Sequence, residues 1–202
     1  MKRCFGDGDS LYAQYHDAEW GRPVIDERGL YERLCLEAFQ AGLSWRTVLH
    51  KRAALRAAFA DFDPERVARY TRGDVMRLMH DAAIIRNRAK IEATIANARA
   101  VLALRETEKP LVALVWAFAS SRSPPPRTGD DRPATTPESA ALARVLRAHG
   151  FRFVGPTTAY ATLQAAGLVN DHLADCSVRT AVERERTAAI AALIAEGAYA
   201  GG

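Results

Sequence analysis

The sequence predicts an all-α protein, and three observations lead to this prediction. Apolar residues recur at helical spacing, most clearly at Ile91, Ile95, Ala98 and Leu102, which lie on one face of a helix. No stretch alternates polar and apolar residues for long enough to predict a sheet. The chain has 202 residues, 49% hydrophobic and 26% charged, which is the composition of an ordinary folded domain.

End signals and apolar spacing place the expected helices along the chain. Asp63-Pro64 is typical of a helix start, and Pro137 and Gly150 bound another helix. Residues rich in Pro, Ser and Thr between 120 and 137 are expected to form an exposed loop. We expect residues 1–180 to form a single domain and residues 181–202 an appended helical tail. The helices are expected over residues 30–42, from 64, and over 86–106, 137–150 and 157–166.

The net charge of +4 is unevenly distributed. Residues 1–45 carry 5 basic and 8 acidic side chains, residues 46–105 carry 13 and 6, and the remainder carries 10 and 10. Arginine accounts for 24 of the 28 basic residues. A GC-rich genome explains that ratio but not the clustering, which indicates a polyanionic partner without requiring one. No apolar run approaches the ~20 residues that span a bilayer, and no secretory signal is visible. We therefore expect a cytoplasmic, monomeric protein with no membrane partner.

Two pairs of metal-ligating residues stand near opposite ends of the chain. Cys4 and His16 lie near the N-terminus, and His172 and Cys176 are an i, i+4 pair near the C-terminus. Two cysteines and two histidines could complete a tetrahedral zinc site of structural type. From spacing alone, scattered buried thiols and imidazoles are an equally good interpretation. The third cysteine, Cys35, lies between two leucines and is expected in the core.

Glu37 is a carboxylate on an apolar helical stripe. It takes the i+7 position of a stripe formed by Leu30, Leu34 and Ala41, whereas Glu32 and Arg33 are expected to face solvent. A buried carboxylate is costly unless it is paired or lines a polar pocket. Glu37 could cap a neighbouring helix or meet an arginine, or it could face a cavity and recognise an amine or a cation. Aromatic residues in the same region could form a slot for a flat, electron-poor ring; they are Phe5, Tyr12, Tyr15, Trp20, Phe39 and Trp45.

Residues 150–158 are typical of a tight link between two helices. Gly150 and Gly155 allow close backbone approach, and free amides at the start of the second helix could hold an anion. Such a helix-hairpin-helix grips a DNA backbone without reading its sequence. A plain helical hairpin, with glycine at the first C-cap, fits the same residues.

Taken together, these stretches resemble the DNA-3-methyladenine glycosylase I family, from residue 3 to about residue 176. The stretches that carry the resemblance are Tyr15-His16-Asp17-Ala18-Glu19-Trp20-Gly21, Leu36-Glu37 with Gln40-Ala41-Gly42-Leu43-Ser44-Trp45, Ile84-Ile85-Arg86 with Lys90-Ile91, Phe153-Val154-Gly155, and Gly167-Leu168-Val169-Asn170-Asp171-His172.

The resemblance implies an all-α helix-hairpin-helix glycosylase that excises 3-methyladenine from alkylated double-stranded DNA. It implies that Glu37 is the catalytic, base-recognising residue. Tyr15 and Trp45 would stack on the base, with Tyr12 and Trp20 nearby. It also implies one structural Zn²⁺ that joins the two ends of the chain through Cys4, His16, His172 and Cys176. The implied DNA contacts are a wedge at Gly42 and Leu43 and the hairpin residues Gly150, Val154, Gly155 and Thr157.

The chain departs from the family pattern at several positions. Phe5-Gly6 replaces a tryptophan after the first cysteine, and Ala38-Phe39 replaces a small polar pair beside the glutamate. Ala83 and Ala89 stand where glycines are frequent. These changes bear on the size and selectivity of the pocket, not on the reaction class. The same residues also fit two other classes of protein: a module that binds damaged DNA without cutting, and a zinc hydrolase with Glu37 as its base and an open metal site.

Overall fold

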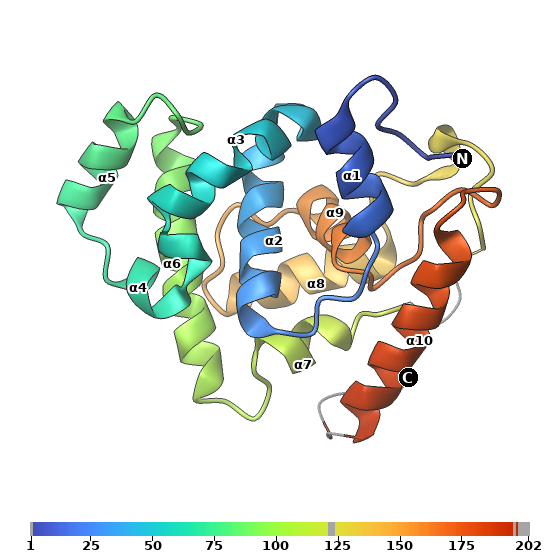
Figure 1. Ribbon diagram of the computed structural model, residues 1–202. Helices are drawn as coiled ribbons and strands as arrows, with labels where there is room; N and C mark the ends of the chain where they lie inside the picture. Colours follow the sequence, from blue (N-terminus) through green and yellow to red (C-terminus); the bar gives the residue numbers. More distant parts are fainter. Residues whose placement is uncertain (1, 121–123, 196, 198–202) are drawn as a thin grey trace.

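The computed structural model describes residues 2–120, 124–195 and 197, and every regular element in that part of the chain is helical (Figure 1). The prediction of an all-α protein is confirmed. In chain order the elements are α1 Ser10–Ala18, α2 Glu27–Gln40, α3 Trp45–Ala58, the 3-10 helix η1 Ala60–Phe62, α4 Pro64–Ala68, α5 Arg72–His80, α6 Arg88–Arg105, α7 Leu111–Trp116, the 3-10 helix η2 Gly129–Asp131, α8 Pro137–Ala148, α9 Pro156–Ala165 and α10 Arg179–Ala195.

Helix α2 runs through the centre of the molecule, against α3, α6, α7 and α9 (Figure 1). It begins at Asp26, whose carboxylate accepts a hydrogen bond from the Gly29 amide at 2.7 Å. Every side chain from Leu34 to Phe39 is buried, including Cys35. A helix covered on several sides has little solvent face, so α2 carries Glu37 into the interior.

Two expectations for α2 are wrong. Ala41 was expected on the buried stripe but is exposed, because α2 ends at Gln40 and the chain turns away at Gly42, where φ is +78°. Glu32 and Arg33 were expected to face solvent, but their side chains are 15% and 11% exposed. Glu32 pairs with Arg56 at 2.8 Å, and Arg33 pairs with Glu19 at 3.2 Å. Glu19 directly follows α1, and the Tyr15 ring of α1 lies against the same guanidinium, so both cover Arg33.

The other expected helices are present close to their predicted bounds. Asp63 caps α4, where its carboxylate accepts from the Glu65 and Arg66 amides. The expected helices over 86–106, 137–150 and 157–166 correspond to α6, α8 and α9. Helices α8 and α9 pack against each other, and the short link between them forms a hairpin (Figure 1).

The N-terminal segment and the loop before α10 meet on one side of the molecule, whereas the far end of α10 lies away from them (Figure 1). The Ser177 amide donates to the Lys2 carbonyl at 3.0 Å. Arg186 of α10 is 2% exposed and donates to the carbonyls of Gly167 and Leu168 at 2.7 and 2.9 Å. These bonds hold α10 against the preceding loop. Residues 196 and 198–202 of the expected tail, and 121–123 of the expected loop, lie outside the described residues. In the described part, no helix is both long and apolar enough for a membrane span.

Candidate functional site

Aromatic side chains from α1, from the segments on either side of it and from the start of α3 surround a cavity of about 240 Å³, which we call the Glu37 pocket. Tyr15 and Trp45 lie against each other with their ring centroids 5.1 Å apart, and Phe5 stacks on Tyr12 at 4.7 Å. Helix α9 and the loop before α8 close the remaining sides. The pocket is lined by Phe5, Tyr12, Tyr15, Trp20, Glu37, Gln40, Trp45, Arg132, Ala161 and Gln164.

Glu37 is a buried carboxylate with no hydrogen-bond partner among the described residues. It is 5% exposed. Removal from water raises its pKa from 4.5 to about 8, and the nearby positive charge of Arg33 opposes this rise only in part. Glu37 neither caps a helix nor forms an ion pair within the described chain. A ligand that brings hydrogen-bond donors or positive charge would therefore supply what this carboxylate lacks.

Unsatisfied polar atoms gather around this pocket. In the described part of the chain, three buried side-chain nitrogens have no hydrogen-bond partner: Arg33 Nη1, Trp45 Nε1 and Arg132 Nη2. Trp45 and Arg132 line the pocket, and the Arg33 guanidinium lies 5.7 Å from the Tyr15 ring centroid. Because buried donors without partners are costly, their concentration here marks a site organised for a ligand rather than for stability.

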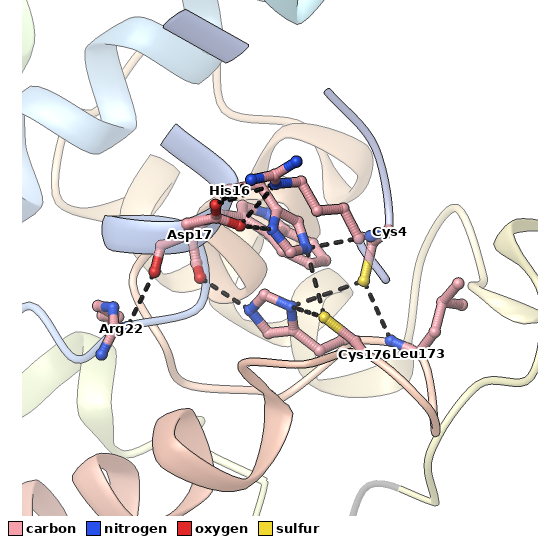
Figure 2. Close-up of polar contacts among 9 residues, drawn as sticks. Cys4, His16, Asp17, Arg22, Leu173 and Cys176 are labelled. Carbon is pink, nitrogen blue, oxygen red and sulfur yellow. Dashed lines mark hydrogen bonds and ion pairs between the residues drawn. The ribbon is translucent and has the colours of Figure 1, made fainter. Parts of the chain in front are cut away.

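Four metal-ligating side chains from residues 4–16 and 172–176 converge beside this pocket, where the ring of the pocket residue Trp20 lies 4.6 Å from the His172 ring. Figure 2 shows Cys4, His16 and Cys176 close together. We call Cys4, His16, His172 and Cys176 the Cys/His cluster. Cys176 Sγ lies 3.4 Å from His16 Nε2 and 3.4 Å from His172 Nδ1, and Cys4 Sγ lies 3.6 Å from His172 Nδ1. All four ligand atoms lie within 4.8 Å of one another.

The donor set and its surroundings fit a tetrahedral metal ion. Zn²⁺ bond lengths of about 2.3 Å to sulfur and 2.0–2.1 Å to nitrogen place such donors roughly 3.6 Å apart. The second nitrogen of each imidazole is also occupied: His16 Nδ1 lies 2.8 Å from Asp17 Oδ1, and His172 Nε2 lies 2.9 Å from the Trp20 carbonyl (Figure 2). Such partners orient metal-binding histidines. Burial also lowers the pKa of His172 to about 4, which keeps it in the neutral, metal-binding form.

Asp171, which precedes a cluster histidine, is held away from the Glu37 pocket. It is 6% exposed, and its Oδ2 accepts from the Tyr160 hydroxyl at 2.6 Å and from Gln164 Nε2 at 2.7 Å. Gln164 lines the pocket, whereas Asp171 lines a different cavity behind α9. Its carboxylate therefore braces the pocket wall through Gln164.

The turn after α2 lies next to the pocket and projects from the surface. Leu43 is 43% exposed. Lys90 is buried and donates from Nζ to the Phe39 carbonyl at 2.8 Å and to the Ala41 carbonyl at 2.5 Å, which fixes the end of α2. A second cavity of about 390 Å³ runs from Glu37 past this turn to the start of α9. It connects the pocket to both predicted DNA-contacting segments; its lining includes Gly42, Leu43, Thr157 and Thr158.

The hairpin between α8 and α9 differs from expectation in the side chains it presents. Val154 is 2% exposed, so only its backbone can face a ligand, whereas Phe153 is 41% exposed with φ at +58°. This backbone conformation is strained for a phenylalanine. Buried Asn97 holds the hairpin by accepting from the Arg152 amide at 2.7 Å and donating to its carbonyl at 3.2 Å. Sequence reasoning missed Phe153, since no local signal distinguishes it from core phenylalanines.

Comparison with known proteins shows similarity along nearly the whole chain. The family model described as methyladenine glycosylase matches residues 5–180. The DNA-3-methyladenine glycosylase 1 of Escherichia coli K12 is 48% identical over 179 residues, which cover 87% of this chain and 96% of that protein. A crystal structure of a 3-methyladenine DNA glycosylase I aligns with a TM-score of 0.84 at 47% identity, covering 87% of this chain and 98% of the other. A tyrosine-to-phenylalanine variant of such an enzyme in complex with 3-methyladenine aligns with a TM-score of 0.83 at 36% identity, covering 89% and 98%.

Proposed function

This chain belongs to the methyladenine glycosylase family, and from that premise we propose that it hydrolyses the bond between 3-methyladenine and deoxyribose in alkylated double-stranded DNA. The enzyme is a base-excision glycosylase, and its products are the free base and an abasic site. The observation that carries the proposal is the buried, unpaired carboxylate of Glu37 inside an aromatic pocket. We assign base recognition to this pocket.

The chemistry of the substrate explains why such a pocket suits it. Alkylation at N3 leaves adenine with a positive charge and an electron-poor ring. Tyr15 and Trp45 stack on that ring, and Glu37 accepts hydrogen bonds from it. A normal base is neutral, so it gives the buried carboxylate no compensating charge and binds more weakly. The pocket thereby selects the damaged base before any bond breaks.

The reaction needs selective capture more than strong acid catalysis. The flipped base leaves when the C1′–N9 bond breaks and its electron pair passes to N9, which neutralises the positive ring. Water adds to C1′ and loses a proton to complete the abasic site. Removing the base from the helix stack costs a few kcal/mol, which the stacking and Glu37 contacts offset. Glu37 acts in this scheme as the group that holds and orients the leaving base.

The turn after α2 and the α8–α9 hairpin hold the DNA in this proposal. Leu43 enters the duplex where the base has left, and Gly42 permits the turn that presents it. The hairpin is a helix-hairpin-helix element whose backbone amides at Gly155 and Thr157 face the phosphates. Phe153, exposed at its tip, adds an apolar contact. One cavity connects the turn after α2 and the start of α9 to the pocket, which supports this placement of the DNA.

The Cys/His cluster would hold one structural Zn²⁺ in our proposal. Four protein ligands leave no open coordination position for water, so the ion would fasten the chain ends and take no part in hydrolysis. Trp20 belongs to both sites, because the residue lines the pocket and its carbonyl is hydrogen-bonded to His172. The zinc site would therefore also help to position the base-recognition pocket. Since the substrate is chromosomal DNA, we propose that the enzyme acts at the nucleoid in the cytoplasm. We also propose that it acts as a monomer.

The decisive experiment identifies the base released from methylated duplex DNA by chromatography, with 3-methylguanine and 7-methylguanine as comparators. We expect the wild type to release 3-methyladenine preferentially. At enzyme concentrations below saturation, Glu37→Gln should slow release about a hundredfold, because capture of the charged base is weakened. Glu32→Gln is the matched control, because Glu32 lies on the same helix outside the pocket and pairs with Arg56 at 2.8 Å. Tight binding of methylated DNA without released base would instead make the chain a binding module, and full activity of Glu37→Gln would remove its assigned role.

A further inference from the structure

We infer that Arg132 is a further substrate-contacting residue, whose positive charge opposes the charge of the bound base and promotes its departure as a neutral molecule. The inference rests on the proposed function, since it concerns the base held in the Glu37 pocket. Arg132 lies in the loop before α8, outside all the sequence stretches that carry the family resemblance.

Arg132 is fixed at the wall of the pocket. Its guanidinium lies 5.2 Å from the ring centroid of Trp20, and its Nε donates to the Asp171 carbonyl at 3.0 Å. The side chain of Asp171 is held by Tyr160 and Gln164. Because the cavity is small and Arg132 lines it together with Glu37, a base that fills the pocket contacts both groups.

The positive charge of Arg132 is not neutralised by the protein around it. Among the described residues, no carboxylate lies within ion-pair distance of its guanidinium, and Nη2 is buried without a hydrogen-bond partner. Its field reaches the pocket wall, where it lowers the pKa of Tyr12 against the raising effect of burial. Arg132 is half-buried, and a partly buried charge with no carboxylate partner costs stability, so its retention beside a ligand cavity points to a role toward the ligand.

The direction of charge movement in the reaction gives Arg132 that role. A carboxylate alone stabilises the cationic base better than the neutral base that leaves, and stabilising the ground state in this way slows bond breaking. As the C1′–N9 electron pair moves onto the base, positive charge passes from the ring to the sugar carbon. Repulsion by Arg132 is therefore strongest before cleavage and falls during it. Arg132 offsets the excess ground-state binding that Glu37 creates.

Binding of two related purines tests this inference without turnover. The probes are 3-methyladenine, neutral in mildly alkaline buffer, and 3,9-dimethyladeninium, a permanent cation with its N9 substituted. Trp20 and Trp45 line the pocket, so their fluorescence reports occupancy. We expect Arg132→Met to tighten binding of the cation roughly tenfold, as removal of a nearby unit charge predicts. Binding of neutral 3-methyladenine should change by less than about twofold on the same scale. An equal change for both probes overturns the inference.

The rate of base release gives a second test of the role of Arg132. At saturating enzyme, Arg132→Met should release 3-methyladenine roughly tenfold more slowly while half-saturating at lower enzyme concentration, the pattern of lost ground-state destabilisation. Arg132→Lys, which keeps the charge, should stay close to the wild type. Arg127→Met is the matched control, because Arg127 lies in the same loop but is exposed and lines a different cavity. An unchanged or faster release rate in Arg132→Met overturns the inference.

Two features keep this test separate from failure of the proposed function. If the wild type releases no base at all, the glycosylase proposal fails, yet the ratio of the two binding constants still reports on Arg132. If Arg132→Met lacks a cooperative unfolding transition, Arg132→Gln makes the same comparison, because its amide can keep the hydrogen bond to the Asp171 carbonyl while the charge is lost.

Discussion

The Cys/His cluster and the Glu37 pocket both border Trp20, and they differ in how far the protein satisfies its own polar atoms. In the cluster, both imidazoles have partners on each nitrogen, and the Leu173 amide donates to Cys4 Sγ at 3.2 Å. In the pocket, a carboxylate and two nitrogens that line it have no partner among the described residues. The first region is built to hold the chain together, and the second is left incomplete for a ligand.

This difference has opposite consequences for stability. Residues of a satisfied cluster stabilise the fold, so their removal should unfold it. Residues of an unsatisfied pocket cost stability, so their removal should strengthen the fold while it weakens function. Substitutions in the two regions should therefore separate stability from activity, and the following three can break or sharpen the contrast.

The largest effect is expected from Cys176→Ser in the cluster. Loss of one ligand should lower the metal content below one per chain and the free energy of unfolding by several kcal/mol, because metal binding and folding are coupled. Metal analysis and thermal unfolding with and without a chelator measure both quantities. The control is Cys35→Ala, which removes a buried thiol elsewhere and should leave the metal content unchanged. Equal losses in the two variants, with no chelator effect, would contradict a metal role for the cluster.

Glu37→Gln should raise the free energy of unfolding, whereas Cys176→Ser should lower it. The folded protein raises the pKa of Glu37 from 4.5 to about 8, so between these values the native state binds more protons than the unfolded state. The stability of the wild type should therefore be full below about pH 4.5 and should fall as the pH rises through about 8. Because glutamine is neutral at every pH, the variant should lack this decline and be more stable by a few kcal/mol in alkaline solution.

Urea unfolding of both proteins across this pH range measures the effect. Glu32→Gln serves again as the control, since Glu32 pairs with Arg56 and its loss should leave the alkaline decline in place. Parallel pH profiles for the wild type and Glu37→Gln would show that Glu37 is already compensated in the folded protein, and the contrast between the two regions would then disappear.

Features that repeat along the chain or follow local rules could be predicted from the sequence. Apolar spacing located α2 and α6, and the proline at position 64 marked the start of α4. The spacing of His172 and Cys176 indicated half of the cluster, although these residues lie in the loop between α9 and α10 and not on the helical turn that the i, i+4 spacing predicts. Whether this pair lies beside Cys4 and His16 depends on the path of the whole chain, so the spacing of the residues could not predict it.

Features created by tertiary contacts were missed. Arg33 was expected in solvent because helical spacing places it opposite the apolar stripe, but Glu19, just after α1, pairs with it there. Arg132 lies in a polar loop whose local sequence carries no sign that it reaches the Trp20 ring. Phe153 looks like a core residue until its backbone conformation and exposure are known. The partners of Arg33 and Arg132 come from other parts of the chain, and the hairpin that carries Phe153 is held by distant Asn97.

The smallest effect is expected from Asp171→Asn, which tests where the pocket ends. Both hydrogen bonds to the Asp171 carboxylate come from groups that hold it away from the Glu37 pocket, namely the Tyr160 hydroxyl and Gln164 Nε2. An asparagine can keep one of them, so base release should fall by less than about tenfold, the cost of one weakened buried hydrogen bond. Gln164→Ala should slow base release by a similar amount, because it removes the hydrogen bond between Asp171 and the pocket-lining residue Gln164. A loss in Asp171→Asn as large as that in Glu37→Gln would mean that Asp171 turns toward the substrate when DNA binds. The catalytic carboxylate would then lie on the cluster side of the molecule rather than on α2.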